Sequence, residues 1–210
     1  MTPLHAIVDI EAAGRAGWPP RDLARAFLDG GARWIQIRAK QLPANAFVEL
    51  CDAVVRYAES YGATVVVNDR VDLAMASGAA GVHVGQEDLA PATARQLLGP
   101  GAVIGYSTHT IEQVTAALRE PVSYIAVGPV FGTSTKATGY DAVGLDLVSR
   151  AAALAGERPL VAIGGITIDR AAGVIAAGAS AVAVIGDLLV TGDPRARTQA
   201  YLQSLSQFRV

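Results

Sequence analysis

The chain has 210 residues and a mass of 21.6 kDa, which is enough to bury a full hydrophobic core. Hydrophobic residues make up 51% of the chain and charged residues 17%, the balance of a folded globular protein rather than a disordered one. The formal net charge of -2 gives no basis for nucleic-acid binding through a basic face. The single cysteine, Cys51, excludes an intrachain disulfide and a cysteine metal cluster, and we expect it to be a small buried residue.

Nothing in the hydropathy pattern predicts a membrane protein. No uninterrupted apolar run approaches the ~20 residues that a membrane-spanning helix needs. The N-terminal region carries Asp9 and Glu11 and lacks a basic segment followed by an apolar stretch, so no signal peptide is expected. We therefore expect a cytoplasmic protein without a membrane or nucleic-acid partner. Alanine-rich helical segments could support a homodimer.

Short β-branched or aliphatic runs recur along the whole chain at a spacing typical of βα units rather than of hairpins. The strands predicted from these runs are Leu4–Asp9, Trp34–Arg38, Thr64–Asp69, Gly81–Gly85, Val103–Ser107, Tyr124–Val130, Pro159–Gly164 and Ala181–Gly186. The intervening segments have helical periodicity, and those best defined are Pro20–Asp29, Ala46–Ser60, Pro91–Leu98, Ile111–Arg119 and Ile168–Ala177.

Eight such units in 210 residues match a single-domain (β/α)8 TIM barrel that covers residues 1–210. Active sites of this fold form at the C-terminal rim of the strands. A doubly wound open sheet is the alternative, but it leaves an eighth strand and a scattered site to explain.

Alternation along the second strand predicts that Trp34, Gln36 and Arg38 face the barrel interior, while Ile35 and Ile37 face the helices. A buried Arg needs a polar partner. Arg38 could pair with a barrel carboxylate for stability alone. We favour a ligand role for it, because it ends its strand at the predicted rim and a second cation, Lys40, follows.

Cations and carboxylates gather at the predicted rim. Arg38, Lys40 and Lys136 would repel one another unless an anion such as a diphosphate neutralised them. Asp69 and Asp88 follow neighbouring strands, and two carboxylates with phosphate oxygens and water suit Mg²⁺. Each aspartate could instead cap the helix that follows it. The whole set favours a site for a diphosphate and Mg²⁺.

Glycines at the ends of strands seven and eight predict a second anion site. Gly165 and the pair Ile185 and Gly186 lie where barrels of this kind often bind phosphate through backbone N–H groups. A tight turn that needs positive φ is the alternative for these glycines. Among the histidines, we expect His83 to be hydrogen-bonded in the interior, His109 to lie at the rim and His5 to line the pocket floor. Their spacing does not match a zinc site.

The sequence closely resembles the thiamine phosphate synthase family. The matching stretches run in order along nearly the whole chain: 36–40 (QIRAK), 68–72 (NDRVD), 81–88 (GVHVGQED), 105–109 (GYSTH), 128–136 (GPVFGTSTK) and 162–166 (AIGGI). Members of that family are (β/α)8 barrels. They join hydroxymethylpyrimidine diphosphate to hydroxyethylthiazole phosphate, releasing diphosphate in the presence of Mg²⁺.

The resemblance implies a role for each matching residue. Gln36 would contact the pyrimidine, and its diphosphate would be held by Arg38, Lys40, Asn68, Thr133 and Lys136. Thr133 and Thr135 would bracket the two phosphate groups. Asp69 and Asp88 would bind Mg²⁺, and the thiazole phosphate would lie against Gly165, Ile185 and Gly186. Ser107 would lie beside the reacting centre, which makes Lys136, Arg38 and Ser107 the catalytic candidates. The loop Phe131–Val143 would bring Lys136 to the site.

Three positions depart from the family pattern. His5 stands where many synthases have Tyr, Gly132 where many have Pro, and Gly186 where a Ser is common. A related branch, thiazole tautomerase, more often has this His, and it is the main rival. Pro129 occupies the place of that branch's strand-six histidine, which favours the synthase. A non-catalytic thiazole-phosphate-binding regulator is the other rival, but it would not need Asp69, Asp88 and Lys136.

Overall fold

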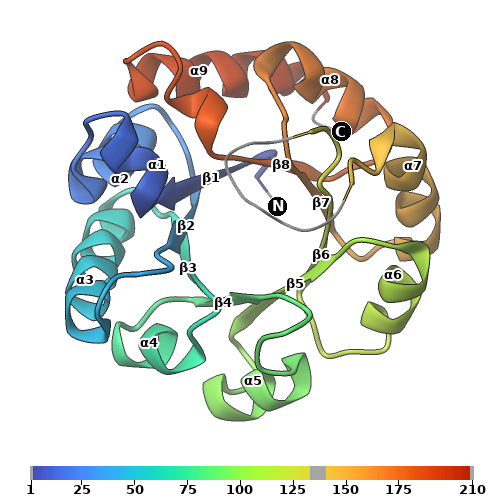
Figure 1. Cartoon of the computed structure of the whole chain (residues 1–210), viewed down its shortest axis with the longest axis horizontal. Helices are drawn as coiled ribbons and strands as arrows, with labels where there is room; N and C mark the ends of the chain where they lie inside the picture. The colour runs from blue at the N-terminus through green and yellow to red at the C-terminus, as the bar shows by residue number, and fades with distance from the viewer. Residues whose placement is uncertain (1, 133–140, 209–210) are drawn as a thin grey trace.

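Eight parallel strands pair in chain order, and the last pairs with the first, so that they close into a barrel (Figure 1). The computed structural model describes residues 2–132 and 141–208. The strands are β1 Leu4–Asp9, β2 Trp34–Arg38, β3 Thr64–Asn68, β4 Gly81–Val84, β5 Val103–Thr108, β6 Tyr124–Val127, β7 Leu160–Ile163 and β8 Ala181–Val184. Since Ala6 of β1 pairs with Val184 of β8, the predicted TIM barrel is confirmed and the open sheet is excluded.

Helices form a ring around the strands (Figure 1). They are α1 Ile10–Arg15, α2 Pro20–Asp29, α3 Ala44–Ser60, α4 Val71–Ala76, α5 Pro91–Leu98, α6 Ile111–Ala117, α7 Gly144–Ala155, α8 Ile168–Ala176 and α9 Pro194–Leu205, with the short 3₁₀ helices η1 Gly186–Leu188 and η2 Ser206–Phe208. Within the described ranges, none of these helices is long and apolar enough to cross a membrane.

The barrel has two apolar layers, as the alternation along its strands requires. Ile35 and Ile37 pack outward in the large core between strands and helices, which also contains the buried Cys51. Trp34 packs in a smaller interior cluster with Tyr124 and other inward-facing residues. The predicted orientation of β2 is therefore confirmed.

Several strands end earlier than predicted. Asp69 adopts a φ of 64°, a left-handed conformation that no strand residue can have, so β3 ends at Asn68. Because Pro129 has no N–H to donate to a ladder, β6 ends at Val127 rather than Val130. Helix α1 was not predicted. It begins directly after Asp9, whose Oδ1 accepts a hydrogen bond of 2.8 Å from the N–H of Ala12 and caps the helix.

Candidate active site

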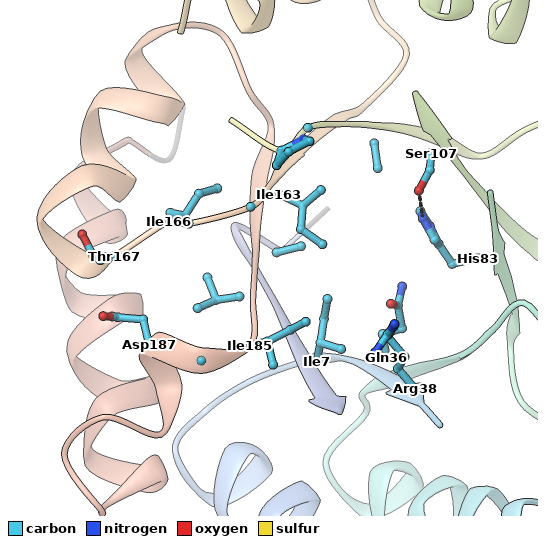
Figure 2. Close-up of a pocket in the computed structure, with 18 of the residues that line it drawn as sticks. Ile7, Gln36, Arg38, His83, Ser107, Ile163, Ile166, Thr167, Ile185 and Asp187 are labelled. Carbon is cyan, nitrogen blue, oxygen red and sulfur yellow. Dashed lines mark hydrogen bonds between the residues drawn. The ribbon is translucent and has the colours of Figure 1, made fainter. Parts of the chain in front are cut away.

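A cavity of about 400 Å³ lies at the C-terminal ends of the strands. Figure 2 shows its two ends, with isoleucine side chains between them. The polar end is lined by Gln36, Arg38, Asn68, His83 and Ser107. The glycine end is lined by Gly164, Gly165, Ile166, Thr167, Arg170, Ile185, Gly186 and Asp187. The cavity therefore joins residues that are up to 183 positions apart in the chain, from Ile7 to Val190.

Arg38 lines the polar end and is buried, with 9% of its surface exposed. Its Nη1 forms an ion pair with Asp9 Oδ2, and the two residues are partners in the register of β1 and β2. Arg38 thus has the barrel carboxylate that the sequence left as an alternative, yet it also faces the cavity. Its buried Nε has no hydrogen-bond partner among the described residues, an unsatisfied donor that is unusual in a folded protein and calls for a polar partner.

Lys40 lies just outside the cavity lining. Its Nζ forms an ion pair with Asp69 Oδ2, and its backbone N–H donates a 3.1 Å hydrogen bond to Glu11 Oε1. The side chain of Lys40 is 48% exposed, so this ion pair is screened by solvent and its ammonium group can move. Lys40 therefore lies beside the polar end without being fixed in it.

The carboxylates of Asp69 and Asp88 converge beside the polar end. Burial raises the pKa of Asp88, and the nearby Asp69 carboxylate raises it further, while the N–H of Gly85, 2.7 Å from Asp88 Oδ2, acts in the opposite direction. Neither aspartate caps a helix, since α4 follows Arg70 and α5 follows Ala90. The helix-cap alternative is therefore wrong for both residues. Two converging carboxylates suit a divalent cation completed by water.

His83 connects the cavity to the barrel interior. Its Nε2 lies 2.8 Å from Ser107 Oγ, and its Nδ1 lies 2.8 Å from Tyr124 Oη (Figure 2 shows the first contact). Burial raises the pKa of Tyr124, so the phenol stays protonated. The expectation that His83 is an interior, hydrogen-bonded histidine is confirmed.

His5 does not line the cavity, so the expectation that it forms the pocket floor is wrong. It lies deeper in the barrel, with its ring stacked on Trp34 at a centroid distance of 4.3 Å. Burial lowers the pKa of His5 to about 3, so the ring is neutral. Ile7, two residues further along β1, faces the cavity instead. His109 does lie at the rim, where its Nδ1 is 2.5 Å from the carbonyl oxygen of Gly128.

The glycine end is shaped by two consecutive glycines after β7. Gly164 and Gly165 have φ values of 102° and 60°, which disfavour any other residue. A Cβ on Gly165 would lie 2.5 Å from the carbonyl oxygen of Gly132, and one on Gly164 would lie 2.5 Å from Pro129. The tight turn is therefore real, and it also exposes backbone to the cavity, as do Ile185 and Gly186 after β8.

The fold and this geometry together agree with the comparisons with known proteins. The sequence profile described as thiamine monophosphate synthase matches residues 4–188. The chain belongs to the thiamine monophosphate synthase family.

Full-length relatives of this family support the assignment. A thiamine-phosphate synthase of Moorella thermoacetica is 40% identical over 98% of this chain and 97% of its own length. The one from Roseiflexus castenholzii is 39% identical over 97% of this chain and 88% of its own. A bifunctional ThiM/ThiE protein of Symbiobacterium thermophilum is 46% identical, and the match covers 39% of its length.

Among solved structures, a thiamine phosphate pyrophosphorylase from Pyrococcus furiosus has a TM-score of 0.88 at 30% identity, over 97% of this chain and 95% of that chain. The family, the fold and the enzyme class predicted from the sequence, a transferase of thiamine biosynthesis, are confirmed.

Three residues that the family resemblance assigns to the phosphate groups of the substrates, Thr133, Thr135 and Lys136, lie outside the described residues. The other cavity residues named from the sequence, namely Gln36, Arg38, Asn68, Ser107, Gly165, Ile185 and Gly186, all line one cavity.

Sequence reasoning did not identify Asp9, Arg170 or Asp187. Asp187 directly follows Gly186, just after the end of β8, which was a usable signal for its position at the rim. Arg170 lies in the first turn of α8 and has no motif of its own.

Proposed function

We propose that this chain joins hydroxymethylpyrimidine diphosphate to hydroxyethylthiazole phosphate and releases thiamine phosphate and diphosphate. The observation that carries the proposal is the two-ended cavity. One end presents a buried guanidinium with a donor left over and a pair of carboxylates beside it. The other end presents a glycine turn, and the space between them is apolar. Two phosphorylated substrates would meet in such a cavity with their reacting ends at its centre.

We assign the polar end to the pyrimidine diphosphate. Gln36 would contact the pyrimidine, and Arg38 with Asn68 would bind the diphosphate, because a guanidinium and an amide can each donate more than one hydrogen bond to phosphate oxygens. Lys40 would exchange its Asp69 partner for the substrate. Beyond the described residues, Thr133 and Lys136 are proposed diphosphate ligands, and Thr133 and Thr135 are proposed to bracket the two phosphate groups.

Asp69 and Asp88 are the proposed Mg²⁺ ligands. The raised pKa of Asp88, caused by burial and by the neighbouring Asp69 carboxylate, supports this assignment, since a divalent cation would relieve the repulsion between the two carboxylates. When bound, Mg²⁺ would stabilise the negative charge that develops on the departing diphosphate. We propose no zinc site.

The reaction is proposed to be a dissociative substitution at the methylene carbon of the pyrimidine. The carbon–oxygen bond to diphosphate breaks, and its electron pair leaves with the diphosphate oxygen. The thiazole nitrogen then forms the new bond with its own lone pair, so no general base is required. Arg38 and Lys136 would stabilise the leaving charge, and Ser107, held by His83, would lie beside the reacting carbon. Catalysis would rest on positioning and electrostatics.

Thiazole tautomerisation is the rival reaction, and it needs a general acid or base. The geometry gives no support to His5 in that role, because it lies below the cavity and its low pKa prevents it from holding a proton near neutral pH. A thiazole-phosphate-binding regulator would leave the carboxylate pair without a purpose. We also propose a cytoplasmic location, and the homodimer stays a prediction.

The test is to incubate the purified protein with both substrates and Mg²⁺ and to measure thiamine phosphate after oxidation to thiochrome. The proposal predicts product that disappears with EDTA and returns with added Mg²⁺. Binding of thiazole phosphate without any product would contradict the coupling reaction.

A further inference from the structure

The glycine end of the cavity has two charged side chains among the residues described, Asp187 and Arg170. Asp187 Oδ2 is already saturated. It accepts hydrogen bonds from Tyr201 Oη at 2.6 Å, from Arg197 Nη2 at 2.8 Å and from the backbone N–H of Ile168 at 3.2 Å. The negative charge of Asp187 is therefore neutralised by Arg197, a residue that does not line the cavity.

Arg170 has no carboxylate partner within the described ranges of the chain. Its Nη1 donates a 3.0 Å hydrogen bond to the carbonyl oxygen of Gly165. Its guanidinium carbon lies 4.6 Å from the centroid of the Phe131 ring. These contacts hold the flat guanidinium at the glycine turn but use one of its five N–H donors. The remaining donors and the full positive charge are directed to solvent or to a ligand.

Backbone N–H groups at the glycine end carry only partial positive charge, so they would leave much of the charge of a phosphate dianion uncompensated. A phosphate monoester carries about -1.5 to -2 charges near neutral pH. The N–H of Ile168, the first residue of α8, is taken by Asp187, and Gly186 has no hydroxyl to donate. A cation beside these N–H groups would neutralise the phosphate further, and a guanidinium matches the geometry of phosphate oxygens.

We propose that Arg170 binds the phosphate of the thiazole substrate and makes the site selective for the phosphorylated thiazole over the free alcohol. This inference rests on the proposed function, since it assigns one residue to one substrate of that reaction. The side-chain contact that a hydroxyl at position 186 would give to the phosphate is thus supplied by Arg170 in the first turn of α8.

The test compares Arg170→Met with the unchanged protein on two acceptors, hydroxyethylthiazole phosphate and hydroxyethylthiazole. Methionine keeps an apolar side chain over Phe131 and removes the charge. The KM for the phosphorylated acceptor should rise roughly tenfold to a hundredfold, the range for a lost charge-assisted contact, and the loss on the alcohol should be much smaller. Arg170→Lys should recover part of the selectivity. Arg150→Met, an exposed arginine of α7 away from the cavity, is the matched control.

An equal loss on both acceptors would show that Arg170 only supports the loop, and an unchanged KM for the phosphorylated acceptor would show that it does not contact the phosphate. Either result overturns the proposal. Should the unchanged protein form no thiamine phosphate, the proposed function fails separately. Calorimetric titration of hydroxyethylthiazole phosphate into the same variants then tests Arg170, with tighter binding to the unchanged protein as the supporting result and equal binding as the contradicting one.

Discussion

His83 lies between Ser107 and Tyr124, with one ring nitrogen 2.8 Å from each hydroxyl oxygen. Ser107 and His83 face the cavity, whereas Tyr124 is buried in the barrel interior. The side-chain rotamer of a serine without hydrogen-bond partners is determined mainly by its own backbone conformation. Here the hydroxyl direction is fixed by a ring that is itself held by a phenol, so we interpret His83 as a positioning residue for Ser107.

Removing His83 should therefore act through Ser107. We expect His83→Ala and Ser107→Ala each to lower kcat by roughly tenfold, the factor that ~1.4 kcal/mol gives, with smaller effects on KM. The double variant should lose no more than Ser107→Ala alone, because the two residues act as a unit. Additive losses would show that His83 acts independently. His83→Gln, which can still reach Ser107, is the control for simple loss of packing.

Asp9 should be essential for stability because its carboxylate is 1% exposed and paired with Arg38. Breaking a buried pair from one side leaves an uncompensated charge, so Asp9→Asn should lower the free energy of unfolding by about 3 kcal/mol in urea titrations. Asp52→Asn is the matched control. It removes a pair with Arg56 on the surface of α3, where the side chains are 44% and 70% exposed, and should cost less than ~1 kcal/mol. Similar losses in both variants would contradict this account.

Gly165 in the glycine turn and Gly173 inside α8 should respond to alanine in opposite ways. Gly165→Ala places a Cβ 2.5 Å from the carbonyl oxygen of Gly132 at a φ of 60°, so it should distort the glycine turn and raise the KM for thiazole phosphate. Gly173 lies inside α8 with nothing within 4 Å of its Cβ position. Gly173→Ala should stabilise the protein by roughly 0.5–1 kcal/mol in thermal or urea unfolding, without altering that KM.

Asp88 should destabilise the metal-free protein at neutral pH. Burial and the Asp69 carboxylate raise the pKa of Asp88, so its charged form is disfavoured in the folded state. The resulting loss of folding stability is absent at low pH, where Asp88 is protonated, and grows as the pH rises through the raised pKa. Asp88→Asn should therefore raise the Tm of the metal-free protein at pH 7 and abolish the additional rise in Tm that Mg²⁺ gives. A lower Tm for Asp88→Asn, with Mg²⁺ still stabilising it, would contradict the assigned carboxylate pair.

His5 should lower the free energy of unfolding at acidic pH. Its pKa falls from 6.5 to about 3 on folding, so between these values the unfolded chain binds a proton that the folded chain excludes. Stability should then fall by up to ~1.4 kcal/mol for each pH unit below 6.5, in addition to other groups. His5→Phe, which keeps a ring on Trp34, should show a shallower pH dependence of the free energy of unfolding between pH 4 and 6. Parallel curves for the two proteins would refute this role.

The sequence alone predicted the barrel and which side chains of a strand face its interior. The alternation along β2 separates Trp34, Gln36 and Arg38, which face inward, from Ile35 and Ile37, which face the helices. The sequence was also sufficient to place most of the polar end, since parallel strands bring their C-terminal residues to one rim.

Contacts that depend on how separate strands and helices come together could not be predicted from one segment at a time. Asp9 was considered only as an early charge, although pairing of β1 with β2 brings it directly beside Arg38. His5 was placed too near the cavity, because alternation gives the direction of a side chain but not its depth in the barrel. Arg170 and Asp187 depend on how α8 and α9 pack against the rim, which their own sequences do not encode.

The most direct test of the central claim, that one cavity holds two phosphorylated substrates at opposite ends, is a crystal structure with thiamine phosphate, diphosphate and Mg²⁺ bound. We predict diphosphate and metal between Arg38 and the Asp69–Asp88 pair, and the thiazole phosphate against Gly165 and Arg170. Phosphate of the product bound at Arg38, or a metal away from both aspartates, would contradict the account.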